Sequence, residues 1–142
     1  MLVDNMSKKA VKIISIIFVL IMLSTLLIAC NAQTYKHRLE NKGYTVFYAE
    51  IDEQTVKEFG TLGSQLREYG LSIDDVKWAM LGMEPIKSED VVTIYHFKNK
   101  DTANIFYTKF SEELKDENEH LEIDKKDVFY GTEKGIKDAR TR

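Results

Sequence analysis

The chain has 142 residues, with 20 lysines and arginines against 23 aspartates and glutamates, and a single cysteine. This length suits one domain and excludes a two-domain enzyme with a cleft between the domains. One cysteine cannot pair within the chain, which excludes a disulfide scaffold, and the acidic balance argues against a nucleic-acid partner.

The first 29 residues have the pattern of an export signal. Lys8, Lys9 and Lys12 precede an uncharged apolar run over residues 13–29. Because basic residues stay on the cytoplasmic side of a membrane, we expect the rest of the chain to be exported. The run is near the lower limit for a spanning helix, about 17 residues, so its length fits both a cleaved signal and a permanent anchor.

The end of this leader, Leu27-Ile28-Ala29-Cys30, favours the cleaved signal. It resembles the lipobox of bacterial lipoproteins, in which apolar residues and then a small residue precede a cysteine. The resemblance implies cleavage before Cys30, acyl chains on Cys30 and stable anchoring at the outer face of the cytoplasmic membrane. Because the leader carries three lysines and Asp4, its removal would change the net charge from −3 to −5. The alternative is an uncleaved transmembrane anchor.

Residues 30–42 are predicted to be a polar tether, and residues 43–142 a single domain. The tether offers little apolar surface, so only Tyr35 and Leu39 are able to dock it onto the domain.

The domain is predicted to start with a strand and two helices. Residues 45–51 are rich in β-branched and aromatic residues, which is typical of a strand. A helix then runs from Asp52 to Gly70. A short second helix, ending at Gly82, carries Trp78. A helix this short cannot bury its whole circumference, so Trp78 lies either in the core, which we favour, or in a partner-binding patch.

The second half is predicted as strand, helix, strand and helix. Residues 91–97 are the strongest strand signal, and Asp101 begins a helix with an apolar stripe. Residues 112–127 are mostly charged and are expected to be the helix end and a loop. Residues 128–130 form a short strand, and Thr132 begins a final helix.

The element order is therefore β-α-α-β-α-β-α, which favours an α+β domain built as a two-layer sandwich. We expect about three strands in one sheet, with the helices packed mainly on one face. The strand, helix and strand between residues 91 and 130 would form a right-handed parallel crossover.

Four stretches of this half also suggest a relationship: Ile94-Tyr95-His96-Phe97, Ala103 with Tyr107, Val128-Phe129-Tyr130-Gly131-Thr132, and Ile136-Lys137-Asp138. They are similar to a pattern in small uncharacterised lipoproteins of low-GC Gram-positive bacteria. The resemblance covers about half of the mature chain. It implies a lipid-anchored surface domain and carries no catalytic residues.

Catalytic and metal-binding patterns are weak in this sequence. The three histidines lack close ligand spacing, so no metal site and no cofactor are predicted. His96 shares a predicted strand face with Ile94 and is the only plausible general base. The acidic residues between 112 and 127 are expected to be solvated, with weak divalent-cation binding as the alternative. Neither a Walker loop nor a nucleophile elbow is present.

Aromatic residues give the candidate binding surface. Each predicted strand carries one tyrosine: Tyr48, Tyr95 and Tyr130. A row of tyrosines on the uncovered face of the sheet would suit a ligand or partner, with core packing as the alternative. With Trp78 and His96, these tyrosines form the set of candidate site residues.

These patterns favour a membrane-anchored, non-enzymatic module that binds an envelope protein, a peptide or a small ligand. The alternative is a cell-envelope enzyme or accessory subunit with a site near His96 and the strand tyrosines. A third, structural hypothesis is assembly with another envelope protein through the helix that carries Trp78.

Overall fold

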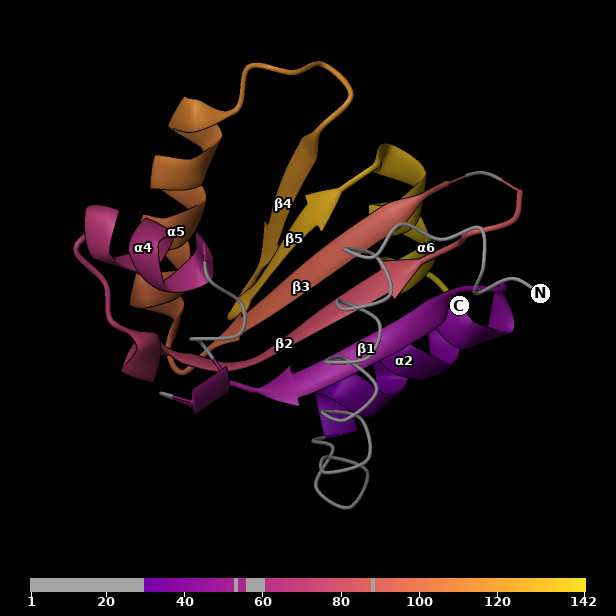
Figure 1. The fold of residues 1–142 in the computed structure, drawn as a ribbon, viewed down its shortest axis with the longest axis horizontal. Helices are drawn as coiled ribbons and strands as arrows, with labels where there is room; N and C mark the ends of the chain where they lie inside the picture. The colour runs from indigo at the N-terminus through magenta and orange to yellow at the C-terminus, as the bar shows by residue number, and fades with distance from the viewer. Residues whose placement is uncertain (1–29, 53, 56–60, 88) are drawn as a thin grey trace, which may run out of the picture.

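The computed structural model describes residues 30–52, 54–55, 61–87 and 89–142, and its centre is one antiparallel sheet (Figure 1). The strands are β1 (Thr45–Glu50), β2 (Val76–Met83), β3 (Val91–Phe97), β4 (His120–Asp124) and β5 (Asp127–Gly131), in the order β1-β2-β3-β5-β4. The helices are α2 (Cys30–Asn41), α4 (Thr61–Glu68), α5 (Lys100–Glu113), α6 (Glu133–Arg140) and the 3-10 helix η2 (Ile73–Asp75). Within these ranges, no helix has the length and apolar character needed to cross a membrane.

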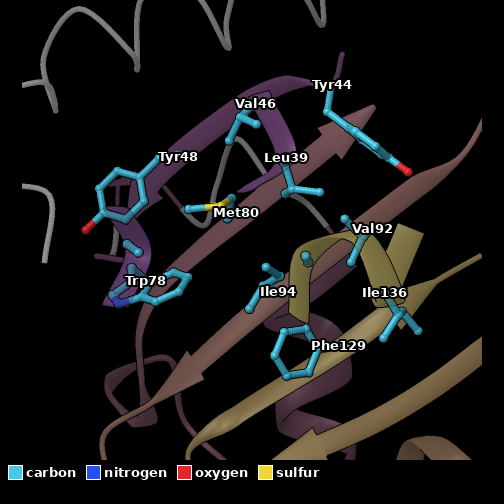
Figure 2. Close-up of a cluster of buried hydrophobic side chains, with 12 residues drawn as sticks. Leu39, Tyr44, Val46, Tyr48, Trp78, Met80, Val92, Ile94, Phe129 and Ile136 are labelled. Atoms are coloured by element: carbon cyan, nitrogen blue, oxygen red, sulfur yellow. The ribbon is translucent and has the colours of Figure 1, made fainter. Parts of the chain in front are cut away.

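Helices cover both faces of the sheet. Helices α2 and α6 pack on one face, the α2/α6 face, against a core centred on Trp78, Ile94 and Phe129 (Figure 2). Helices α4 and α5 pack on the other, the α4/α5 face, where Phe97 and Phe106 are fully buried. Side chains alternate between the two faces along the strands, apart from a register shift between Val76 and Trp78 in β2, so the sheet contributes to two separate cores.

The predicted α+β class is confirmed, whereas the predicted sheet and layers are wrong in detail. The sheet has five strands rather than three, and its helices form layers on both faces rather than mainly on one. The expected parallel crossover is also wrong, because β3 and β5 pair antiparallel. The chain returns from α5 through β4, which forms a hairpin with β5.

Two strands were mispredicted. The segment around Trp78 is not a helix but β2, whose central place in the sheet puts apolar residues on both of its faces. A short continuous apolar run of this kind does not distinguish a buried strand from a buried helix. Strand β4 lies in the segment expected to be a charged loop, although Leu121 and Ile123 alternate there with polar residues.

Residues 30–42, expected to be a polar tether, instead form α2 packed on the sheet. Ala32, Tyr35 and Leu39 share one side of this helix; Ala32 and Leu39 are fully buried, and Tyr35 packs beside them. Arg38 and Lys42 donate hydrogen bonds to carbonyl oxygens at the end of α6. Tyr35 and Leu39, the two residues predicted to dock this segment, both do so.

The other predicted elements agree more closely. Residues 91–97 form β3 as predicted, and Thr132 caps α6 by accepting a hydrogen bond from Gly135 N–H. Helix α5 is capped by Asn99 rather than by Asp101. Only part of the predicted helix from Asp52 to Gly70 lies within the described residues, where α4 covers its second half.

Gly131 is required where β5 passes close to the start of β3. Its φ is +153°, and a Cβ atom added there would lie 2.2 Å from the carbonyl oxygen of Val91. We expect Gly131→Ala to lower the free energy of unfolding by about 1–3 kcal/mol, because backbone must move. Gly70→Ala is the matched control: its φ is +75°, but the added Cβ has open space. Urea denaturation of both variants would measure the difference in the free energy of unfolding. Equal losses of stability in the two variants would contradict the predicted clash with the Val91 carbonyl oxygen.

Candidate functional site

A polar cluster on the α2/α6 face contains the predicted residue His96. The register of the sheet places His96 on β3 opposite Asp127 on β5, and His96 Nδ1 lies 2.5 Å from Asp127 Oδ1. The Tyr35 hydroxyl of α2 donates to the other oxygen of Asp127, Oδ2, over 2.5 Å. Asp127 therefore joins the sheet to the helix that begins at Cys30. The side chains of His96 and Asp127 are only 13% and 9% exposed.

Trp78 packs flat against His96 in the same cluster. Their ring centroids lie 5.0 Å apart with an interplanar angle of 8°. The rings of Tyr35 and Tyr48 lie 6.3 Å and 5.7 Å from that of Trp78. Trp78 is 1% exposed, which agrees with the core position that we favoured, and its Nε1 has no hydrogen-bond partner among the described residues. An unpaired buried N–H is costly and rare in native structures.

The geometry of this cluster leaves one nitrogen of His96 for chemistry. Asp127 engages Nδ1, so Nε2 is the atom able to exchange a proton with a bound molecule. Burial, followed by the hydrogen bond to Asp127, raises the pKa of Tyr35 above its ordinary value of 10.0. Tyr35 therefore remains a neutral donor to the carboxylate.

The predicted row of tyrosines is wrong. Tyr48 points to the α2/α6 face beside Trp78, whereas Tyr95 and Tyr130 pack on the α4/α5 face. The five candidate residues are thus divided, with Tyr48, Trp78 and His96 on one side of the sheet. The sequence alone did not identify Asp127 as the partner of His96, nor Tyr35 as the second partner of Asp127. Asp127 was expected in a loop, and only the β4–β5 hairpin brings it opposite His96.

An apolar cavity of about 180 Å³ lies between α4 and strands β1 to β3. Tyr48 and Tyr95 both border it; the other lining residues are Phe47, Ala49, Thr61, Leu62, Ala79, Met80, Leu81 and Thr93. A partly exposed apolar strip continues from the cavity along the same face of the sheet, because Met83 follows Leu81 by two residues and Val91 precedes Thr93 by two. Met83 and Val91 are 38% and 37% exposed.

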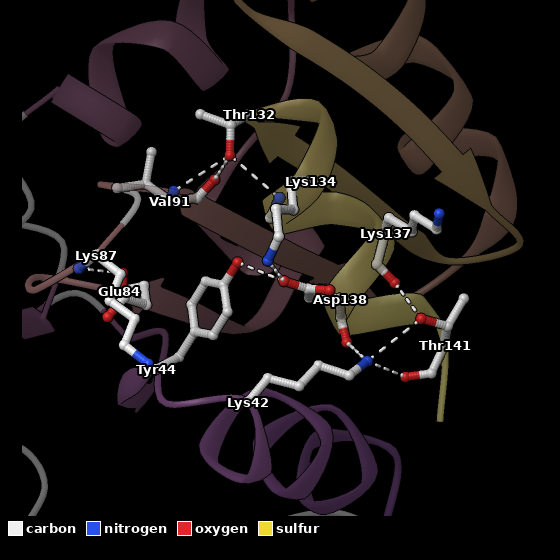
Figure 3. A network of polar contacts seen from close by, with 11 residues as sticks. Lys42, Tyr44, Glu84, Lys87, Val91, Thr132, Lys134, Lys137, Asp138 and Thr141 are labelled. Atoms are coloured by element: carbon white, nitrogen blue, oxygen red, sulfur yellow. Dashed lines mark hydrogen bonds and ion pairs between the residues drawn. The ribbon is translucent and has the colours of Figure 1, made fainter.

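A second group of polar contacts holds α6 in place (Figure 3). Tyr44 donates to Asp138 over 2.8 Å, and Lys134 pairs with the same carboxylate at 2.8 Å. Burial alone would raise the pKa of Asp138, but the hydrogen bonds from Lys134 and Tyr44 outweigh it and lower the pKa. Every polar side chain at the centre of this group has a protein partner, so the group is structural.

Metal binding receives no support from the described residues. They contain no group of three or more histidine, cysteine, aspartate or glutamate residues placed to hold an ion. The acidic stretch between 112 and 127, expected to be a solvated loop, is divided between the end of α5, a short connection and the β4–β5 hairpin.

Alkaline pH is expected to destabilise the protein through its buried tyrosines. Burial, with hydrogen bonds to Glu113 and Glu119, raises the pKa of Tyr69 and of Tyr130 to about 12 each. Between their ordinary value of 10.0 and about 12, the unfolded chain loses these protons while the folded chain keeps them. The stabilisation is complete below pH about 10 and falls as the pH rises through this window. Urea denaturation midpoints at pH 9 and pH 11 would measure this loss of stability. Tyr69→Phe should reduce the difference between the two midpoints. A midpoint that is the same at both pH values would contradict the prediction.

Comparison with known proteins gives no relative from which to transfer a function: no protein-family model, no curated protein and no solved structure matches this chain.

Proposed function

We propose that this protein is a lipid-anchored extracytoplasmic module that binds a protein or peptide partner through an apolar anchor side chain. The observation that carries the binding part is the apolar cavity between α4 and the sheet, with the apolar strip beside it. The location rests on the lipobox at Cys30 and the basic, apolar leader before it.

The size of the cavity favours a side chain over a whole small ligand. Pockets for drug-sized ligands measure about 300–1,000 Å³, whereas a cavity of about 150 Å³ holds a molecule such as benzene. The cavity here, about 180 Å³, thus suits one aromatic or branched apolar group. Buried anchors of this kind contribute much of the affinity of protein interfaces.

The surroundings of the cavity also fit a larger partner. Leu81 lines the cavity and is half-buried, and Met83 and Val91 extend the apolar surface toward the β2–β3 connection. Ile86 in that connection is 86% exposed. A partner that places one side chain in the cavity would cover this strip as well. Contiguous apolar surface of this kind is typical of interaction sites.

The anchoring part is tested by mass spectrometry of the protein purified from membranes. We expect a mature N-terminus at an acylated Cys30, and Cys30→Ala should abolish acylation and leave the leader attached. A different N-terminus in the native protein would contradict the lipoprotein proposal, while leaving the binding proposal to be judged separately.

The binding part is tested by photo-crosslinking in intact cells. A photoreactive amino acid at Met83 should give a discrete crosslinked protein, whereas the same group at Thr108, exposed on α5, should not. Filling the cavity with Ala79→Leu should lower the yield about tenfold or more, in line with loss of an interface anchor. A thermal melt of this variant checks folding. Crosslinking at both positions, or a yield that Ala79→Leu leaves unchanged, would contradict the proposal.

An acid–base role for His96 is the second candidate function, favoured by its short contact with Asp127. A carboxylate that holds Nδ1 fixes the orientation of the imidazole, as in many hydrolytic sites. Neither of the cavities beside α4 and α6 is lined by His96, which is why this candidate ranks below binding.

A further inference from the structure

Strand β4 forms an outer edge of the sheet and is open along that edge. It pairs with β5 on one side only, at the end of the order β1-β2-β3-β5-β4. In antiparallel pairing, alternate residues direct their backbone groups away from the neighbouring strand. Apart from the ladder with β5, no backbone hydrogen bond in the described part of the chain involves residues 120–124. An edge strand whose outward backbone groups have no partner in the sheet is able to pair with another strand.

The residues on either side of Glu122 are complementary to one another. When β4 is placed antiparallel to a second copy with Glu122 at the centre, Leu121 lies opposite Ile123 of the other copy, and His120 lies opposite Asp124. One step further out, Glu119 lies opposite Lys125. These are an apolar pair, a histidine–carboxylate pair able to hydrogen-bond, and an opposite-charge pair, all of types that stabilise cross-strand contacts.

The only like-charge pair in this register is Glu122 with itself. Each Glu122 already has a cation of its own chain beside it, because Arg140 Nη1 lies 3.4 Å from Glu122 Oε1. The ion pair with Arg140 therefore reduces the repulsion between the two Glu122 carboxylates at the centre of the pairing.

The surface around β4 is also incomplete in a single chain. Leu121 and Ile123 are only partly buried against the core of the α4/α5 face. On the other face, an open hollow of about 520 Å³ lies between β4 and α6, and Arg140 of that helix reaches the strand only through its ion pairs with Glu122 and Asp124. A second strand at this edge would bury Leu121 and Ile123 further.

We propose that two copies of this chain associate through their β4 strands, so that their sheets join into one antiparallel sheet. The two-fold axis is perpendicular to the sheet, because antiparallel strands of one sheet are related in that way. Both α2 helices consequently lie on the same side of the joined sheet. Two chains anchored in one membrane are able to pair in this manner, and confinement to that membrane raises their effective concentration.

Cysteine crosslinking of the full chain in its membrane tests this pairing. Residues directly opposite at a non-hydrogen-bonded position have Cα atoms about 4.5 Å apart, a separation that a disulfide spans. Glu122→Cys should therefore give a disulfide-linked dimer on mild oxidation. The controls are the unaltered chain, which contains only Cys30, and Lys109→Cys on the exposed side of α5.

A charge exchange identifies the register. Adding Asp124→Lys to Glu122→Cys places a cation opposite His120 and should lower the crosslinked fraction about fivefold or more. Adding His120→Glu as well places an anion opposite the new cation and should return the fraction to its starting value. Sedimentation of the detergent-solubilised chain gives an independent measure, in which Glu122→Gln should increase the dimer. Absence of the Glu122→Cys crosslink, or a crosslink that Asp124→Lys leaves unchanged, would overturn the proposal.

Discussion

Trp78→Ala is expected to lower the free energy of unfolding by about 3–5 kcal/mol, the range measured for large aromatic residues removed from cores. Trp78 is 1% exposed and contacts the rings of His96, Tyr35 and Tyr48, so its removal leaves a cavity between three neighbours. A domain of this size has a total stability of about 5–15 kcal/mol, so the variant should be close to unfolding. Urea denaturation followed by circular dichroism measures the change.

A second substitution separates packing from the unpaired N–H of Trp78. Trp78→Phe keeps an aromatic ring in the site and removes Nε1, which has no hydrogen-bond partner among the described residues. We expect this variant to lose less than half as much stability as Trp78→Ala. A loss below about 1 kcal/mol for Trp78→Ala itself would contradict the core role of this residue.

Asp127→Ala is expected to cost about 2–4 kcal/mol, because one carboxylate serves two partly buried partners. The substitution removes the acceptor of the Tyr35 hydroxyl and the group that holds His96 Nδ1. Both partners come from other elements, α2 and β3, so the loss should also loosen α2 from the sheet. Hydrogen exchange of the α2 amides, alongside urea denaturation, would detect this.

The matched control is Asp124→Ala on the same hairpin. Asp124 is exposed, and among the described residues its side chain pairs with Arg140 at 3.6 Å, a surface pair that contributes about 1 kcal/mol or less. If Asp124→Ala and Asp127→Ala destabilise equally, the proposed role of Asp127 as a link between α2 and the sheet is wrong.

Local signals in the sequence were sufficient for the elements whose patterns are unambiguous. β-Branched and aromatic residues identified β1 and β3, and Thr132 identified the start of α6. The α+β class followed from these elements. Local signals did not predict strand β2, because its apolar residues are buried on both faces of the sheet. Only its pairing with β1 and β3 distinguishes this segment from a buried helix.

The turn of the hairpin that positions the candidate site lacks the usual sequence signal of a tight turn. Lys125 adopts a left-handed backbone, φ +56°, in the two-residue turn between β4 and β5. Turns of this kind usually contain glycine or asparagine, so the pair Lys125-Lys126 gave no turn signal. Without knowledge of this hairpin, the residue of β3 that lies opposite Asp127 was not predictable. The contact between Asp127 and His96 was therefore not predictable either. Tyr35 was recognised as able to dock, but its partner was not.

If Cys30 carries a lipid as proposed, the docking of α2 limits how far the domain is able to stand from the bilayer. Twelve residues in an extended chain reach about 40 Å, whereas the same residues in a helix span about 18 Å. In this structure α2 lies along the sheet and adds no reach. With a lipid on Cys30, the domain would rest directly on the headgroups and meet only molecules within or immediately above the membrane. Undocking of α2 would extend that reach, so for a lipid-anchored chain the contacts of Tyr35, Arg38 and Lys42 would also set the height of the domain above the membrane.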